Sequence, residues 1–287
     1  MTARPNQNSQ FDKISYTALG VAYARSLSDI PYCSEIADIC GASALSEAER
    51  QVYAALAPYF EVRFKAINRL VARESISNVL ELASGLSPRG LIMADDPNVY
   101  YIETDLPAIL DTKKRLLAAL HKVDPRHGPP EHLTLLPLNV LDEHTFVSVA
   151  QQFPPGPLAI IHEGLLAYFS HNEKKILAEI VHQILSKAGG VWITTDVFTR
   201  DDIRKSAPSR GEQDAVKGVL ADTGRDYVAN AFSTQAEAKD FFERLGFKSS
   251  LYALEAVAGE IASAPHSASA SHFHDQLSLT AWRLTAV

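Results

Sequence analysis

The sequence of 287 residues predicts an α/β fold built on a mostly parallel sheet. Two stretches carry this prediction. Asn78 to Leu82 is a short apolar run interrupted near its end by an acid, and the small-residue turn Ala83-Ser84-Gly85 follows it. A segment of helix length leads to a second apolar run, which ends in Glu103-Thr104-Asp105. Strand, turn, helix and a second strand with an acid at its tip form the opening of a nucleotide-binding βαβ unit.

The turn and the second acid indicate the kind of ligand. Ala83 and Gly85 let backbone amides come close to a ligand because they carry little or no side chain. Asp105 lies about twenty residues beyond Gly85, the spacing at which an acid accepts hydrogen bonds from ribose hydroxyls. A dinucleotide fingerprint needs three glycines, but Ala83 and Pro88 occupy two of those positions. S-adenosylmethionine needs no pyrophosphate cradle, and Glu81 is placed to receive its ammonium group. A strand-turn-helix without a ligand is the simpler alternative.

The chain before this unit is predicted to be helical. Apolar residues between Phe11 and Ser28 recur at helical spacing, and Ser46-Glu47-Ala48-Glu49 is a helix start with acids in its first turn. An apolar stripe from Tyr53 to Val71 then passes Pro58. We interpret its aromatic residues as core, and Arg63 and Arg69 as surface charges.

The chain after the unit continues the alternation of helices and strands. We expect the helix Ala108 to Val123 to place Lys113, Lys114 and Arg115 on a solvated face. Five further strands are expected, and the last two form an antiparallel pair at the end of the sheet: His132 to Leu138, Leu158 to Ile161, Val191 to Val197, and then Lys248 to Val257 with Leu277 to Thr285. Helices are expected at Asn172 to Lys187 and Thr234 to Leu245. The polar segment Thr199 to Asn230 is either a lid over a substrate or a solvated excursion.

Three motifs in order resemble one family. Glu81 to Arg89, Tyr101 to Pro107 and His162-Glu163-Gly164-Leu165-Leu166-Ala167-Tyr168-Phe169 are similar to successive motifs of the leucine carboxyl methyltransferase family. The similarity is greatest to the branch that includes the tetracenomycin polyketide carboxyl methyltransferase, whose N-terminal signature Phe11 to Arg25 also resembles. The resemblance implies a class I methyltransferase Rossmann-like sheet, with residues 1–74 as a helical region covering the cofactor site and 75–287 as the core, including a lid-like insertion at 199–230.

The resemblance also implies a set of site residues. Arg25, with Lys13, would pair with the carboxylate of S-adenosyl-L-methionine, although both could be solvated helix charges. The family usually has an Asp that contacts adenine where this chain has Asn139, which is otherwise a simple turn residue; Val140 would pack on the adenine. The remaining cofactor-binding candidates are Glu81, Ala83, Gly85, Arg89, Glu103, Asp105, Leu106 and Glu163. The catalytic candidates are Glu163, His162 and Tyr168.

The chemistry of the acceptor remains open at this point. Transfer to a carboxylate needs no general base, because a carboxylic acid with a pKa around 4 is already ionised near neutral pH. A phenol or alcohol needs a base, and His162 is the candidate by position. An NAD-dependent oxidoreductase is disfavoured by the missing glycines, and a cofactor-binding protein without activity is the remaining alternative.

Composition excludes several other classes. The formal net charge of −7, without a dense Lys/Arg run, argues against a nucleic-acid partner. Cys33 and Cys40 match no zinc or disulfide pattern, so we expect reduced, buried thiols. The histidines between Ser263 and His274 lack the cysteines or carboxylates that would complete a metal site. No signal peptide or membrane span is evident, and a cytoplasmic protein is expected. The partner is thus a small-molecule acceptor, and the oligomeric state stays undetermined.

Overall fold

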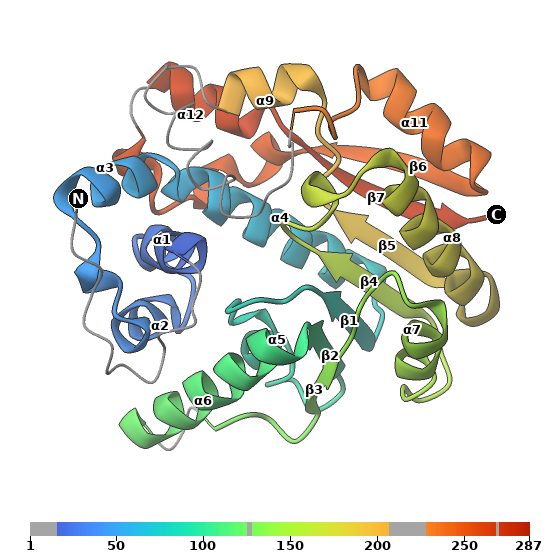
Figure 1. Ribbon diagram of the computed structural model, residues 1–287, viewed down its shortest axis with the longest axis horizontal. Coiled ribbons are helices and arrows are strands. Elements are labelled where there is room, and N and C mark those ends of the chain that lie inside the picture. Colours follow the sequence, from blue (N-terminus) through green and yellow to red (C-terminus); the bar gives the residue numbers. More distant parts are fainter. Residues whose placement is uncertain (1–15, 125–127, 207–227, 268–269) are drawn as a thin grey trace.

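A seven-stranded sheet forms the centre of the described part of the chain. The computed structural model describes residues 16–124, 128–206, 228–267 and 270–287. The strand order is β3-β2-β1-β4-β5-β7-β6 (Figure 1). The first five strands are parallel and β7 is antiparallel to both of its neighbours. The strands are β1 (Asn78–Leu82), β2 (Tyr100–Asp105), β3 (Leu133–Pro137), β4 (Leu158–His162), β5 (Gly190–Thr194), β6 (Phe247–Ala253) and β7 (Thr280–Ala286). The predicted mostly parallel sheet with an antiparallel strand near one edge is confirmed.

The middle strands are apolar because helices cover both faces of the sheet. β1 and β4 are buried along their whole length, and Leu80 pairs with Ile102 on one side and Ile160 on the other. Alternate residues of a strand point to opposite faces. Val79 and Ile161 therefore belong to one hydrophobic cluster, and Leu80 and Ile160 belong to the other. Because the strands β1 to β5 are parallel, their carboxyl ends meet at one edge of the sheet.

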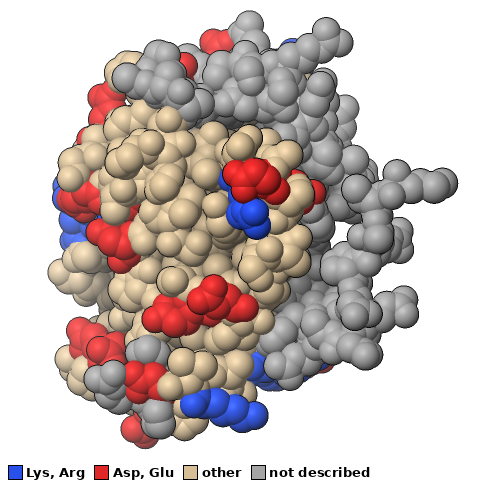
Figure 2. Space-filling view, turned by 90° about the vertical axis from the view of Figure 1, so that its left-hand side faces the viewer, with Lys and Arg blue, Asp and Glu red and all other residues tan. Residues whose placement is uncertain are grey.

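Four helices lie in the described residues before the first strand, where the sequence predicts a helical region: α1 (Tyr16–Ser26), α2 (Cys33–Cys40), α3 (Glu47–Ala55) and α4 (Ala57–Glu74). A capping box starts α3, in which Ser46 and Glu49 each bond the other's backbone N–H. Pro58 lies in the first turn of α4, where a missing N–H costs nothing. The predicted stripe is therefore two helices. Figure 2 views the side with α1 to α3, where acidic side chains gather in several groups and basic ones are few.

Within the described residues, the helices that follow β1 are α5 (Arg89–Met93), α6 (Pro107–Val123), α7 (Glu143–Ala150), α8 (His171–Ala188), α9 (Arg200–Ser206), α11 (Gln235–Arg244) and α12 (Ala270–Leu277). The helices α2, α7, α9 and α12 are additions to the sequence prediction, and each has eight residues or fewer. Their periodic pattern is too short to be distinctive. Most of the segment predicted as a lid, residues 207–227, lies outside the described residues.

The β6–β7 connection returns across the molecule to α4. It contains the 3₁₀ turns η4 (Leu254–Glu260) and η5 (Ala264–His266), followed by α12. The buried Glu61 carboxylate of α4 accepts hydrogen bonds from the backbone N–H groups of Ala262 (3.0 Å) and Ser263 (2.8 Å) and from the Ser263 hydroxyl (2.6 Å). Lys65 neutralises this carboxylate at 2.6 Å. One buried acid thus fixes a long connection that sequence periodicity left unassigned.

Among the helices of the described residues, none is both long and apolar enough to cross a membrane.

Candidate active site at the carboxyl ends of the parallel strands

The turn after β1 has the open geometry that the small residues predict. Ala83 and Gly85 both adopt left-handed backbone conformations, with φ of 49° and 54°. The Asp105 carboxylate at the end of β2 accepts the Gly85 N–H at 2.8 Å and the Leu106 N–H at 2.7 Å. A Cβ built on Gly85 would meet no atom within 4 Å. The turn is therefore held by Asp105 and has free space above it.

Asp105 and Leu106 present one polar and one apolar group beside this space. Burial raises the pKa of Asp105, while the N–H groups of Gly85 and Leu106 oppose that rise. Leu106 is 54% exposed, which is unusual for a leucine beside a buried turn. An apolar side chain next to a carboxylate at the tip of β2 fits the sugar and base of an adenosine.

A buried ion network lies beneath the turn. The Arg89 guanidinium at the start of α5 contacts Glu81 at 3.0 Å and Glu163 at 2.8 Å, and all three side chains are almost completely buried. Tyr101 donates a hydrogen bond of 2.8 Å to Glu81. The Phe64 ring lies 4.1 Å from the Arg89 guanidinium carbon. Glu81, expected to receive the cofactor's ammonium group, therefore has Arg89 and Tyr101 as its partners here.

Arg25 joins this network from the N-terminal helix α1. Its guanidinium donates to Glu163 at 2.9 Å, and both side chains are largely buried. Burial alone would raise the pKa of Glu163, but the guanidinium groups of Arg25, Arg63 and Arg89 hold it below its ordinary value. The buried Arg25 Nε has no hydrogen-bond partner among the described residues. The interpretation of Arg25 as a solvated helix charge is thus wrong, and its predicted companion Lys13 lies outside the described residues.

A second network surrounds His162, at the tip of β4. His162 Nδ1 lies 3.0 Å from Asp196 and 3.2 Å from Thr194, and its ring packs on Trp192. Asp196 also accepts the Leu165 N–H at 2.6 Å and pairs with Arg63. Burial would raise the pKa of Asp196, but Arg63 and His162 lower it far below its usual range. His162 is fully buried and its Nε2 has no partner among the described residues.

Two residues of this second network were not foreseen. Arg63, expected at the surface, is 4% exposed, with its Nε donating to Thr195 at 3.0 Å and its guanidinium over the Tyr59 ring. The prediction was wrong because a helical arginine at the apolar edge looks the same in sequence whether it snorkels or pairs. Asp196 lies two residues beyond the end of the apolar strand β5. The rule that identified Asp105, an acid at a strand tip, could also have identified Asp196.

Glu103 and Lys113 form a third buried pair. The Lys113 Nζ lies 2.5 Å from Glu103, and both side chains are essentially inaccessible to solvent. The expectation of a solvated face for Lys113 is therefore wrong, although Lys114 and Arg115 are exposed. Glu103 Oε1 also accepts the Gly90 N–H at 3.1 Å. Burial raises the pKa of Glu103 to about 7, and Lys113 opposes this rise.

The other predicted residues lie around this edge. Asn139 is exposed and its side-chain oxygen accepts the Leu141 N–H at 3.1 Å, as a turn residue does, while Val140 is buried. Tyr168 is half-buried, and burial, followed by the charge of Asp196, raises its pKa. A Cβ on Gly164 would meet no atom within 4 Å, so space also exists at the tip of β4.

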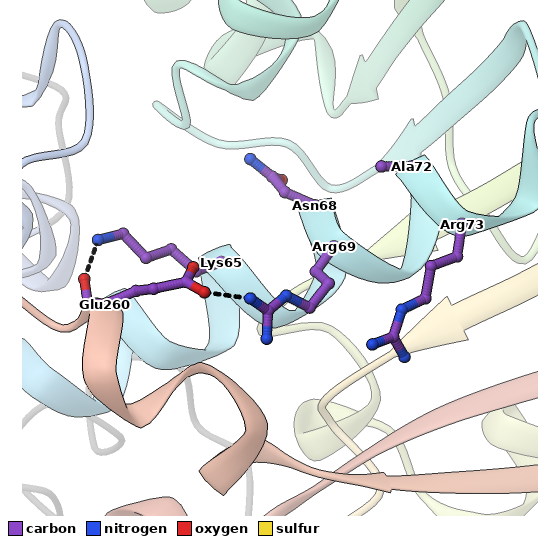
Figure 3. A pocket seen from close by; sticks show the side chains of 6 residues that line it. All are labelled: Lys65, Asn68, Arg69, Ala72, Arg73 and Glu260. Atoms are coloured by element: carbon purple, nitrogen blue, oxygen red, sulfur yellow. Dashed lines mark hydrogen bonds and ion pairs between the residues drawn. The ribbon is translucent and has the colours of Figure 1, made fainter.

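A basic hollow lies elsewhere, on the surface of α4. It has a volume of about 500 Å³ and is lined by Lys65, Asn68, Arg69, Ala72, Arg73 and Glu260 (Figure 3). The two cations Lys65 and Arg69 both bond to Glu260. None of the predicted site residues lines this hollow. Within the described residues, no group of three or more His, Cys, Asp and Glu side chains could hold a metal ion.

Comparisons with solved structures agree with this fold. A DUF574 family protein from Streptomyces avermitilis is similar in structure, with a TM-score of 0.55, 17% identity, and coverage of 93% of this chain and 96% of that one. The methyltransferase domain of bacterial CtHen1 has a TM-score of 0.50 at 10% identity, covering 80% and 100%. At such identities the likeness shows the fold alone. Among curated proteins, none matches the sequence.

The family itself follows from the sequence. The model of the leucine carboxyl methyltransferase family matches residues 26–182, more than half of the chain. This range begins one residue after Arg25 and includes the turn after β1, Asp105 and the motif at the tip of β4. The protein therefore belongs to the leucine carboxyl methyltransferase family and is an S-adenosyl-L-methionine-dependent methyltransferase.

Proposed function

We propose that this methyltransferase transfers its methyl group to a carboxylate of a small molecule, such as a polyketide-like or other secondary metabolite. The burial of His162 is the observation that carries the proposal. Its ring is inaccessible, and its Nδ1 is committed to Asp196. A base enclosed in this way is poorly placed to take a proton from a phenol. A carboxylate arrives already ionised and needs no base.

The cofactor is proposed to lie across the tips of β1 and β2. The Asp105 carboxylate would accept from the ribose hydroxyls, and the exposed Leu106 would cover the adenosine. Asn139 and Val140, at the tip of β3, would meet the adenine. Space above Gly85 allows the ligand to approach the backbone. This placement is supported by the contact of Asp105 with the Gly85 N–H, which puts the carboxylate at the turn.

The amino-acid end of the cofactor is proposed to lie near Arg25 and Glu163. The buried Arg25 Nε, without a described partner, is a donor available to a carboxylate. Lys13 would join it, and the N-terminal region 1–74 would cover this end. Glu163, kept ionised by Arg25, Arg63 and Arg89, would offset part of their positive charge. Glu81 would act with Arg89 on the side of the ammonium group.

The reaction needs mainly alignment and exclusion of water. S-adenosylmethionine supplies a methyl group on a positively charged sulfur, which leaves as a neutral thioether. The protein has to hold the acceptor oxygen in line with that methyl carbon. Tyr168, half-buried near Asp196, is proposed to line the acceptor side. The segment 199–230 is proposed as a cover for this side.

The test uses S-adenosylmethionine with a tritiated methyl group and a panel of small carboxylic acids and phenols. Carboxyl methyl esters release volatile tritiated methanol in mild alkali, whereas methyl ethers keep the label. We expect base-labile label from an acid. Base-stable label from a phenol would instead favour a hydroxyl methyltransferase with His162 as its base. Cofactor binding without transfer to any acceptor would favour a protein that binds the cofactor without activity.

A further inference from the structure

We propose that Lys113 is a positioning residue that holds the cofactor turn in its binding shape. This inference rests on the proposed placement of the cofactor over Ala83-Ser84-Gly85. Lys113 lies in α6, the helix that follows β2, and its side chain is 2% exposed. It extends under the turn and does not face the solvent.

The ammonium group of Lys113 makes three contacts. Its Nζ donates to the backbone oxygen of Ser87 at 2.8 Å, contacts the Ser84 hydroxyl at 3.4 Å, and pairs with Glu103 at 2.5 Å. Ser84 and Ser87 stand at the two ends of the bend, and the Ser87 N–H also bonds the Ser84 oxygen. One cation therefore ties both ends of the bend to strand β2.

Glu103 completes the attachment on the other side. Its second oxygen accepts the Gly90 N–H in the first turn of α5. A Cβ on Gly90 would lie 2.3 Å from that oxygen, so the glycine permits the close approach. Two residues further along β2, Asp105 accepts the Gly85 N–H. Strand β2 thus holds the segment from Gly85 to Gly90 at two points on one face, through Asp105 and through the Glu103–Lys113 pair.

The turn needs such support because of its backbone. Ala83 has a φ of 49°, a left-handed conformation that a residue with a Cβ rarely keeps unless its surroundings impose it. If the turn relaxed when no ligand was bound, part of the binding free energy would be spent on ordering it again, and the affinity for the ligand would fall. Lys113 is buried and contacts Ser84 and Ser87, so its effect on the cofactor passes through these two residues.

Three variants separate this role from simple charge neutralisation. K113M removes the donor but leaves Glu103 buried and unpaired, which endangers folding. The double variant K113M/E103Q removes both charges and keeps an acceptor for Gly90. E103Q alone keeps the Lys113 bond to Ser87. K114M, on the exposed neighbour in the same helix, is the matched control.

The measurements are thermal unfolding, calorimetric titration with S-adenosylhomocysteine, and steady-state kinetics. We expect K113M/E103Q to fold but to bind the ligand about tenfold more weakly or worse, the loss expected for a hydrogen bond from a charged donor. Its KM for S-adenosylmethionine should rise while its kcat at saturating cofactor and its KM for the acceptor hold. K114M should bind nearly as the wild type does, and E103Q should lie between it and the double variant, because Lys113 keeps its bond to Ser87 but loses its partner on strand β2.

Two results would overturn the role of Lys113. One is wild-type affinity in the folded double variant, which would reduce the pair to charge neutralisation. The other is failure of the double variant to fold, which would assign the pair to stability alone. Failure of the wild-type protein to bind S-adenosylhomocysteine would instead remove the proposed cofactor site, and the inference with it.

Discussion

Arg89 and Glu163 form a buried ion pair of 2.8 Å that joins the start of α5 to the tip of β4. These residues are far apart in the chain, and each also contacts a second charged group, Glu81 and Arg25 respectively. The pair therefore links the cofactor turn, the motif after β4 and the N-terminal helix α1. Charges in such a network are individually costly to bury and become favourable only together.

Replacement of Arg89 by Met should destabilise the protein strongly. The variant leaves the buried carboxylates of Glu81 and Glu163 without their shared cation, a change that costs about 3–5 kcal/mol when one partner of a buried pair is lost. Urea unfolding followed by circular dichroism measures the difference. R244M, an exposed arginine at the end of α11, is the control and should unfold with the wild type. Equal midpoints for R89M and R244M would contradict the network.

Asp105→Ala should weaken cofactor binding. The variant removes the carboxylate proposed to accept from the ribose and also releases the Gly85 and Leu106 N–H groups. A hydrogen bond to a charged group is worth about 1.5–3 kcal/mol, which corresponds to roughly a 10-fold to 100-fold loss of affinity. Calorimetric titration with S-adenosylhomocysteine measures it. D111A, on the exposed face of α6, should bind normally; unchanged affinity in D105A would place the cofactor elsewhere.

His162→Gln should leave the methyl-transfer step nearly unchanged if the acceptor is a carboxylate. No proton has to be removed, so the single-turnover rate should also stay flat between about pH 6.5 and 8.5. Rapid quenching after mixing enzyme, tritiated cofactor and acceptor gives this rate. H144Q, an exposed histidine, is the control. A loss of about 100-fold in H162Q, the contribution of a general base, would speak for a hydroxyl acceptor.

Cys33 and Cys40 should not react with a thiol reagent in the folded protein. Both are buried, and burial raises the pKa of Cys33 to about 12 and that of Cys40 to about 11. The reactive thiolate is therefore scarce at neutral pH and becomes abundant only as the pH rises toward these values. Absorbance with a dithiobis-nitrobenzoate reagent should show two thiols only after urea is added. Rapid reaction of either cysteine in the native protein would show that it is accessible.

The strands were predictable from sequence because their signal is local. The largely apolar sequences of β1 and β4 follow from burial on both faces of the sheet. The environment of long charged side chains was not predictable in the same way. Lys113 and Lys114 are adjacent and identical in type, yet one is buried against Glu103 and the other is exposed. Only the register between α6 and β2 decides which is which.

The position of β7 has a consequence for the order of folding. This strand lies between β5 and β6, although β6 precedes it in the chain (Figure 1). During synthesis, β6 therefore has no neighbour in the sheet, and β5 keeps an unpaired edge, until Thr280 to Ala286 have been made. Exposed strand edges invite association with other chains. A nascent chain halted before Thr280 should accordingly be a target for chaperones, however complete its cofactor half already is.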